Sequence, residues 1–152
     1  MKKRANKRLY DNQVEDFKEL CSIICKYYSH WTVTNIPRRR VNVRKYGYDQ
    51  SKEAAKRIAK FDKERMEYKE LLKRRFFSFS KDQKDLDALS RQNNAKGKFK
   101  AVRKENVENI LLYDDVITTE SSFRECVRQL TKVYGDINIV GLFMCSTEVY
   151  KY

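Results

Sequence analysis

The chain has 152 residues, 41% of them hydrophobic, which suits one domain with a single packed core over residues 1–152. One proline and four glycines argue against a low-complexity linker, and no apolar stretch approaches the length of a membrane span. The lysine-rich start lacks the apolar run of a secretory signal, and the four cysteines form no paired disulfide framework. We therefore expect a cytoplasmic protein that does not associate with membranes.

The net charge of +13 is concentrated in the first half of the chain. Residues 1–75 hold 22 Lys and Arg against 10 Asp and Glu, whereas residues 76–152 hold 12 against 11. A field of that sign attracts polyanions, such as a sugar pyrophosphate or a nucleic-acid backbone. Scattered lysines also fit a solvated basic face. The five cations between Arg38 and Lys45 fit it less well, because they repel one another unless an anion lies nearby.

The apolar pattern predicts alternating helices and strands. Apolar residues at three- and four-residue steps indicate an amphipathic helix at about 11–28. A strand at 31–36, a basic loop and a helix at 51–61 follow, while residues 62–75 fit either a continued helix or a short strand. The later expected elements are a short helix at 85–94, strands at 98–102 and 109–113, a helix at 121–134, and a strand at 137–144 that is buried on both faces. This order predicts an α/β fold.

The segment 109–134 carries the clearest functional pattern. An apolar strand ends in two carboxylates, which we expect at an exposed strand end, and a hydroxyl-rich turn leads into a helix. The first turn of a helix offers free N–H groups to a phosphate. Asp114 and Asp115 can accept hydrogen bonds from ribose hydroxyls. The hydroxyl donors are Thr118, Thr119, Ser121 and Ser122. The alternative is an ordinary buried strand, a surface turn and a helix capped by Ser or Thr.

Residues 110–123 resemble the phosphoribosyl pyrophosphate motif of type I phosphoribosyltransferases: an apolar strand, Asp-Asp, two residues, Thr-Thr-Gly, a small residue and Thr. Glu120 stands where that family has glycine. Two further segments resemble the ComF family of competence-associated phosphoribosyltransferase-like proteins. The first is 36–50, which ends in Tyr-Gly-Tyr-Asp-Gln, and the second is 80–99, with Gln83, Leu86, Arg91, Asn94 and then Gly-Lys-Phe. The three segments occur in the order of that family.

The resemblance implies a type I phosphoribosyltransferase-like fold, a mostly parallel sheet flanked by helices. It implies binding of phosphoribosyl pyrophosphate or a related sugar phosphate or nucleotide, with Mg²⁺ bridging the pyrophosphate oxygens. Arg38, Arg39 and Arg40 would face the pyrophosphate, Asp114 and Asp115 the ribose, and residues 118–122 the 5′-phosphate. Transfer of the phosphoribosyl group to an acceptor is the implied reaction, and the sequence names no acceptor and no catalytic residue.

Other functions stay open at this point. Glutamate at position 120 adds bulk and a like charge near the phosphate unless its side chain turns outward, which puts activity in doubt. One alternative is a non-catalytic, degenerate member of the fold that assists DNA uptake or processing together with a DNA-processing protein. Another is a protein that binds nucleic acid directly through its basic half.

The cysteines and the single histidine favour structural roles. Cys21 and Cys25 lie one helical turn apart, and the chain has none of the Cys-x-x-Cys pairs of the zinc module with which ComF relatives often begin. We expect these cysteines to be small buried apolar residues rather than metal ligands. His30 has no nucleophile at a recognisable spacing, so the sequence predicts neither a catalytic triad nor a metal site.

Overall fold

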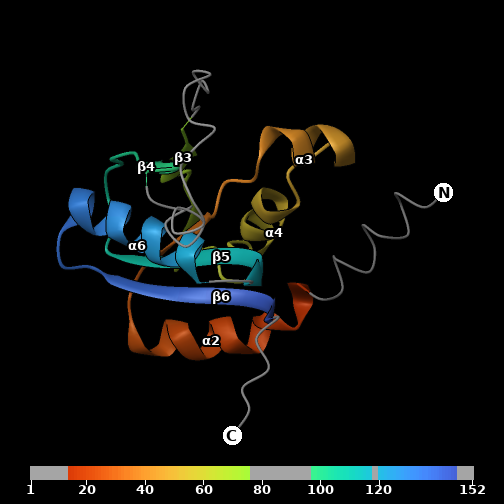
Figure 1. Ribbon diagram of the computed structural model, residues 1–152. Helices are drawn as coiled ribbons and strands as arrows, with labels where there is room; N and C mark the ends of the chain where they lie inside the picture. The colour runs from red at the N-terminus through yellow and green to blue at the C-terminus, as the bar shows by residue number, and fades with distance from the viewer. Residues whose placement is uncertain (1–13, 76–96, 118–119, 147–152) are drawn as a thin grey trace, which may run out of the picture.

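The structure, a computed structural model, describes residues 14–75, 97–117 and 120–146 (Figure 1). Its centre is a four-stranded sheet in the order β2-β1-β5-β6, in which every pair of neighbours is parallel. The strands are β1 (Trp31–Asn35), β2 (Met66–Tyr68), β5 (Asn109–Ile117) and β6 (Asn138–Ser146). The expected α/β fold with a parallel sheet is confirmed.

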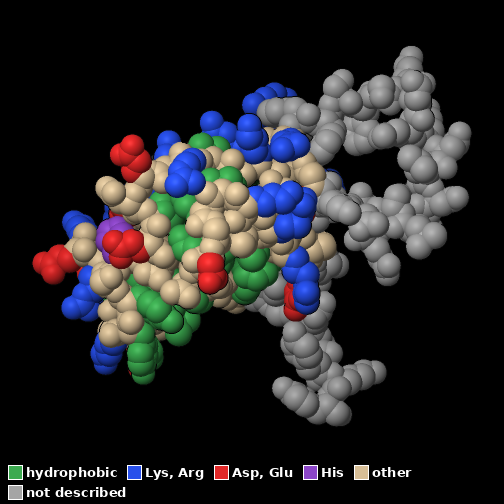
Figure 2. All heavy atoms as spheres, turned by 90° about the vertical axis from the view of Figure 1, so that its left-hand side faces the viewer, with side chains coloured by type: hydrophobic (Ala, Val, Ile, Leu, Met, Phe, Trp, Pro, Cys, Tyr) green, Lys and Arg blue, Asp and Glu red, His purple; other side chains and the backbone are tan. Residues whose placement is uncertain are grey.

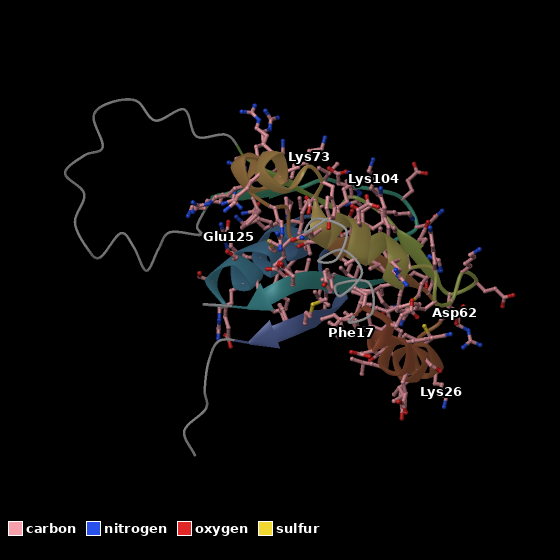
Figure 3. The ribbon with its side chains drawn as sticks, turned by 90° about the vertical axis from the view of Figure 1, so that its right-hand side faces the viewer. Phe17, Lys26, Asp62, Lys73, Lys104 and Glu125 are labelled. Carbon is pink, nitrogen blue, oxygen red and sulfur yellow. The ribbon has the colours of Figure 1, made fainter. Side chains whose placement is uncertain are left out.

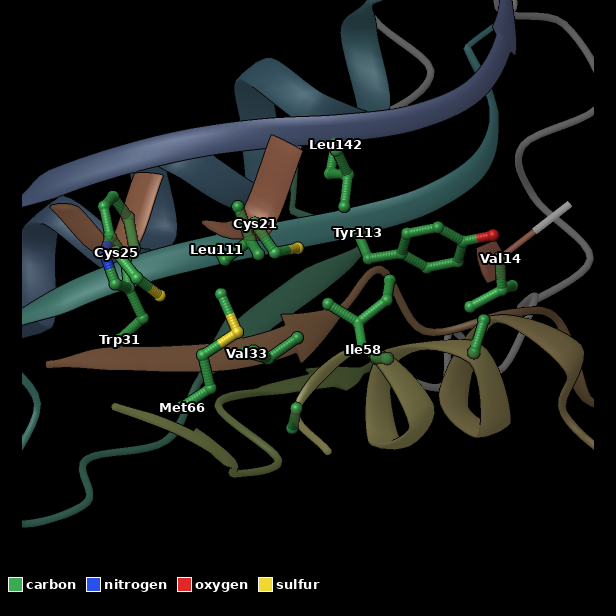
Figure 4. Packing of buried hydrophobic residues seen from close by; sticks show 13 residues of the cluster. Val14, Cys21, Cys25, Trp31, Val33, Ile58, Met66, Leu111, Tyr113 and Leu142 are labelled. Atoms are coloured by element: carbon green, nitrogen blue, oxygen red, sulfur yellow. The ribbon is translucent and has the colours of Figure 1, made fainter. Parts of the chain in front are cut away.

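Helices α2 (Phe17–Tyr27) and α4 (Gln50–Ile58) cover one face of this sheet. Alternate residues of the central strands point toward them, because successive side chains of a strand face opposite sides. Trp31, Val33, Leu111 and Tyr113 are fully buried there and pack with Cys21, Ile58 and Met66 (Figure 4). The edge of the Phe17 ring meets the Tyr113 ring at a centroid distance of 6.1 Å, which joins α2 to β5.

The opposite face of the sheet is covered by helix α6 (Ser121–Tyr134) and by a separate antiparallel pair, β3 (Leu72–Arg74) and β4 (Phe99–Ala101). Figure 1 shows α6 and α2 on opposite sides of β5 and β6. Ile110 and Leu112 of β5 are fully buried on this side, against Leu130 of α6 and Phe99 of β4. Because β5 is buried on both faces, its apolar run shows no polar alternation.

Strand register places the acidic pair beyond the end of β1. Asn35, the last residue of β1, pairs with Tyr113, and the Ile36 amide donates to the Tyr113 carbonyl at 3.0 Å. β5 continues to Ile117 alongside β6. Asp114 and Asp115 therefore lie inside β5, on the part that extends past its shorter neighbour, and not after a strand ending at residue 113 as the sequence predicted.

Two other expectations need correction, and one open alternative is decided. The basic segment is not a loop throughout, since α3 (Arg40–Tyr46) is a short helix that ends at Gly47 in the left-handed conformation, φ 81°. The ambiguous segment 62–75 forms β2 and β3. β6 is an edge strand of the described sheet, and Val140 is 37% exposed, so β6 is not buried on both faces. The expected helix at 85–94 lies outside the described residues.

Three large apolar side chains of α2, Leu20, Ile23 and Tyr27, are exposed. Figure 2 shows apolar side chains from the middle of one face to its lower end, with most Lys and Arg side chains above them and a few beside them. None of the helices in the described ranges has the length and apolar character needed to span a bilayer.

Candidate functional site

A cavity of about 400 Å³ opens at the carboxyl edge of β1 and β5. In open parallel sheets this edge is where ligands usually bind. The walls come from the segment after β1, the extension of β5, the start of α6, α3, and the β3–β4 pair. The lining residues are Ile36, Pro37, Arg38, Arg39, Lys45, Arg74, Lys98, Phe99, Asp114, Asp115 and Ser122.

A larger hollow of about 740 Å³ lies between α4 and β2, away from this edge. Its lining mixes Lys56, Lys60 and Lys63 with Glu53 and Glu67. It contains none of the sequence motifs. We therefore take the smaller cavity as the candidate site, because the acidic pair and the start of α6 meet there.

Arg38 ties the end of β5 to the start of α4. Its guanidinium forms an ion pair with the Asp115 carboxylate, and its Nε donates to Ser51 Oγ at 3.1 Å. Its Nη1 donates to Gln50 Oε1 at 3.0 Å. The side chains of Arg38 and Asp115 are only 16% and 18% exposed, so the expectation of an exposed strand end is wrong for Asp115. Arg38 serves here as a cross-link between two elements of the site.

Asp114 is the more unusual of the two carboxylates. Its Oδ1 accepts a hydrogen bond from the Asp115 amide at 3.0 Å. Burial raises the pKa of its carboxyl to about 7, against the attraction of Arg38, and the negative charge of Asp49 adds to the rise. A carboxyl with a pKa near neutrality, inside a cavity, is a feature found more often at functional sites than elsewhere.

Three cations that line the cavity, Arg39, Arg74 and Lys98, lie close enough to repel one another. The Arg74 guanidinium lies 5.1 Å from the centroid of the Phe99 ring and donates to the Pro37 carbonyl at 3.2 Å. Burial lowers the pKa of Arg74, and the positive charge of Arg39 lowers it further. The pKa of Lys98 falls for the same reasons, burial first and then repulsion by Arg39 and Arg74. A bound anion would relieve this repulsion.

Sequence reasoning did not select Arg74 or Lys98 as site residues. They lie at 74 and 98 in the sequence and meet only because β3 pairs with β4, with Arg74 opposite Phe99. The available signal was weak: Lys98 stands in the Gly-Lys-Phe of the ComF-like pattern, and Arg74 in a basic-aromatic run.

Of the other residues that the sequence predicted for the site, some line the cavity and some do not. Arg39 lines the cavity, whereas Arg40 begins α3, is exposed and does not line it. Ser122, in the first turn of α6, lines the cavity, and Ser121 is half-buried beside it. Thr118 and Thr119 lie outside the described residues.

Glu120 turns along the helix, not toward the cavity. It is the N-cap residue of α6 and makes no side-chain capping bond. Its carboxylate accepts hydrogen bonds from Arg124 Nε at 3.0 Å and Nη2 at 2.6 Å. In this orientation its negative charge does not face a phosphate bound at Ser122. Glu120 thus has an orientation in which its charge does not oppose phosphate binding.

Cys21, Cys25 and His30 do not line the cavity. Cys21 and Cys25 are buried in the core under α2, as expected, and burial raises the pKa of Cys21 to about 12. His30 Nε2 lies 3.0 Å from Glu67 Oε1, next to the amino end of β1. Within the described ranges, no group of three or more His, Cys, Asp or Glu side chains could hold a metal ion.

Comparison with models of known protein families finds no match for this chain, and neither does comparison with curated proteins. The structure therefore defines a class, an α/β protein with a parallel sheet and a charged cavity at its carboxyl edge, and the function has to be argued from that cavity.

Proposed function

We propose that the protein is a ComF-like member of the type I phosphoribosyltransferase fold, and that its cavity binds phosphoribosyl pyrophosphate or a related sugar phosphate. One observation carries this proposal. A wall of three mutually repelling cations, Arg39, Arg74 and Lys98, lies in one cavity with two carboxylates and the first turn of α6. A ligand with a sugar between two phosphate groups complements that arrangement of charge.

Each wall of the cavity suits one part of such a ligand. The three cations would contact the diphosphate. The first turn of α6, through its backbone N–H groups and the Ser122 hydroxyl, would contact the 5′-phosphate. Asp114 would accept hydrogen bonds from the ribose hydroxyls. Arg38 would act indirectly, because it is already bonded to Asp115, Ser51 and Gln50.

The donor set of the cavity also fits Mg²⁺ carried by the diphosphate. Mg²⁺ prefers phosphate and carboxylate oxygens and keeps several waters. Asp114 and Asp115 offer carboxylate oxygens within the cavity. When bound, the ion would neutralise part of the diphosphate charge. We therefore expect ligand binding to strengthen when Mg²⁺ is present.

Catalysis would demand more than binding. In phosphoribosyl transfer the bond between the anomeric carbon and the diphosphate oxygen breaks, the electron pair leaves with the diphosphate, and an acceptor bonds to the carbon. The cation wall would stabilise the departing charge. The roles assigned above leave no described residue of the cavity for activating an acceptor, so we propose ligand binding and leave transfer to an acceptor as the further step to be assayed.

Calorimetric titration tests the proposal directly. Wild-type protein would be titrated with phosphoribosyl pyrophosphate, inorganic pyrophosphate and ribose 5-phosphate, each with and without Mg²⁺. We expect saturable binding of all three, strongest for phosphoribosyl pyrophosphate with Mg²⁺. Asp136→Asn, at an exposed position after α6, is a matched control for changes at the acidic pair. Absence of any heat at millimolar ligand would refute the proposal.

A second candidate function, nucleic-acid binding, is favoured by one observation on the β3–β4 pair. Lys73 and Lys100 are directly opposite each other in the register, and both are exposed. Like charges in that position repel, and an anionic backbone would compensate them. Binding of single-stranded DNA that weakens with salt, and that is unchanged in the Asp114→Asn/Asp115→Asn variant, would support this function over the first.

A further inference from the structure

Glu125 is a buried carboxylate that lies outside the cavity. It is in the second turn of α6, is only 5% exposed and does not line the cavity. Figure 3 labels it on α6. A buried charge is costly unless hydrogen bonds satisfy it, so its partners indicate what it does.

Two of its partners are local and one is distant. Arg128 donates to both carboxylate oxygens at 2.8 Å, and Gln129 donates to Oε1 at 3.0 Å, all within α6. The distant partner is Gly97, whose amide donates to Oε1 at 2.9 Å. The hydrogen bonds from Arg128 lower the pKa of Glu125 to about 2, so the carboxylate is charged at every pH of interest.

Gly97 lies two residues before the start of β4. It has the left-handed conformation, φ 80°, and the next two residues, Lys98 and Phe99, both line the cavity. Phe99 in turn lies against the Arg74 guanidinium. On the other side, the Lys98 carbonyl accepts a hydrogen bond from the Arg75 amide at 2.8 Å. The backbone of this corner is thus held between Glu125 and β3.

We propose that Glu125 is a positioning residue: by holding the Gly97 amide it fixes the corner of β4 from which Lys98 and the Phe99–Arg74 pair face the diphosphate. The inference rests on the proposed function. A two-stranded antiparallel pair alone is only marginally ordered in water, so the corner needs an anchor on a larger element. Without the hydrogen bond from Gly97 to Glu125, Lys98 would become ordered only when the ligand binds. The entropy cost of that ordering would weaken the affinity for the ligand.

The Glu125→Asp variant tests whether Glu125 positions the corner of β4 or only stabilises the fold. Aspartate keeps the charge beside Arg128 but is one methylene shorter, so it cannot reach the Gly97 amide in the present backbone. For Glu125→Asp we expect about tenfold weaker binding of inorganic pyrophosphate with Mg²⁺, because the loss of one charge-assisted hydrogen bond has about that effect. We expect ribose 5-phosphate binding to stay within about twofold of wild type. Glu125→Gln keeps an oxygen for Gly97 and should restore pyrophosphate binding to within about threefold of wild type.

A double-variant cycle with Lys98→Ala completes the test. Because part of the effect of Glu125 passes through Lys98, the double variant should lose less pyrophosphate binding than the sum of the two single losses. Lys104→Ala is the matched control, because this exposed cation lies on the segment that follows β4 and does not line the cavity. Additive losses, or equal losses for pyrophosphate and ribose 5-phosphate, would overturn the inference while the proposed function stands. No pyrophosphate binding by the wild type would overturn both.

Discussion

Asp114 allows a quantitative test of the electrostatics of the cavity. Its carboxyl has a pKa of about 7 in the folded protein, mainly through burial, whereas an aspartate in an unfolded chain titrates near about 3.9. Between these values the folded protein binds more protons than the unfolded chain, so the free energy of unfolding falls as the pH rises. The free energy of unfolding is therefore higher below about pH 4 than above about pH 7, and this difference is lost as the pH rises through about 7.

The size of the effect follows from the shift. Three pKa units at about 1.4 kcal/mol each set a ceiling of about 4 kcal/mol. Because the cavity is open to water, which screens the carboxylate, we expect about half of that, roughly 2 kcal/mol. Asp114→Asn removes the titrating group and keeps an oxygen that can accept the hydrogen bond from the Asp115 amide.

The variant should therefore match the wild type at about pH 4 and be about 2 kcal/mol more stable at about pH 8. Urea unfolding at several pH values, followed by the fluorescence of the fully buried Trp31, measures this difference. Asp136→Asn, at an exposed site, should show no pH-dependent difference. If the gain from Asp114→Asn is the same at every pH, the raised pKa is wrong. The same variant should bind sugar phosphate more weakly, since a stabilising change at a site often costs function.

Three further predictions concern single side chains. Arg39→Ala should weaken pyrophosphate binding about tenfold and ribose 5-phosphate binding less, whereas Arg40→Ala, outside the cavity, should leave both affinities nearly unchanged. Equal losses for the two arginine variants in calorimetry would mean that the arginines supply only a general field. Glu120→Gly should change phosphoribosyl pyrophosphate affinity by less than about threefold, because the carboxylate is paired with Arg124; a large gain would show that glutamate obstructs the ligand. Cys21, whose pKa is about 12, should resist alkylation in the native protein and react in urea, as peptide mass spectrometry would show; labelling under native conditions would contradict its burial.

Local patterns decided much of the secondary structure in advance. The helix expected at 121–134 has the same bounds as α6. The strand expected at 31–36 is one residue longer than β1 at one end, and the strand expected at 98–102 is one residue longer than β4 at each end. The amphipathic helix near the start of the chain is confirmed over Phe17–Tyr27. Periodicity and propensity act over a few residues, so a sequence displays them directly.

Strand length was less predictable from the same patterns. The sequence indicated that β5 would end before Asp114, because charged residues rarely continue a buried strand. The structure extends β5 to Ile117, since β6 continues beside it and supplies hydrogen-bond partners that β1 does not. The place of the acidic pair within the sheet was therefore decided by a neighbouring strand.

The sequence alone thus determined the α/β class, the acidic pair before a helix and the basic segment after the first strand. Only the tertiary structure decided which charges meet. It pairs Arg38 with Asp115, brings Arg74 and Lys98 to one wall, and places Arg40 outside the cavity. These contacts join residues that are tens of positions apart, and their energies depend on burial and distance, which no local pattern contains.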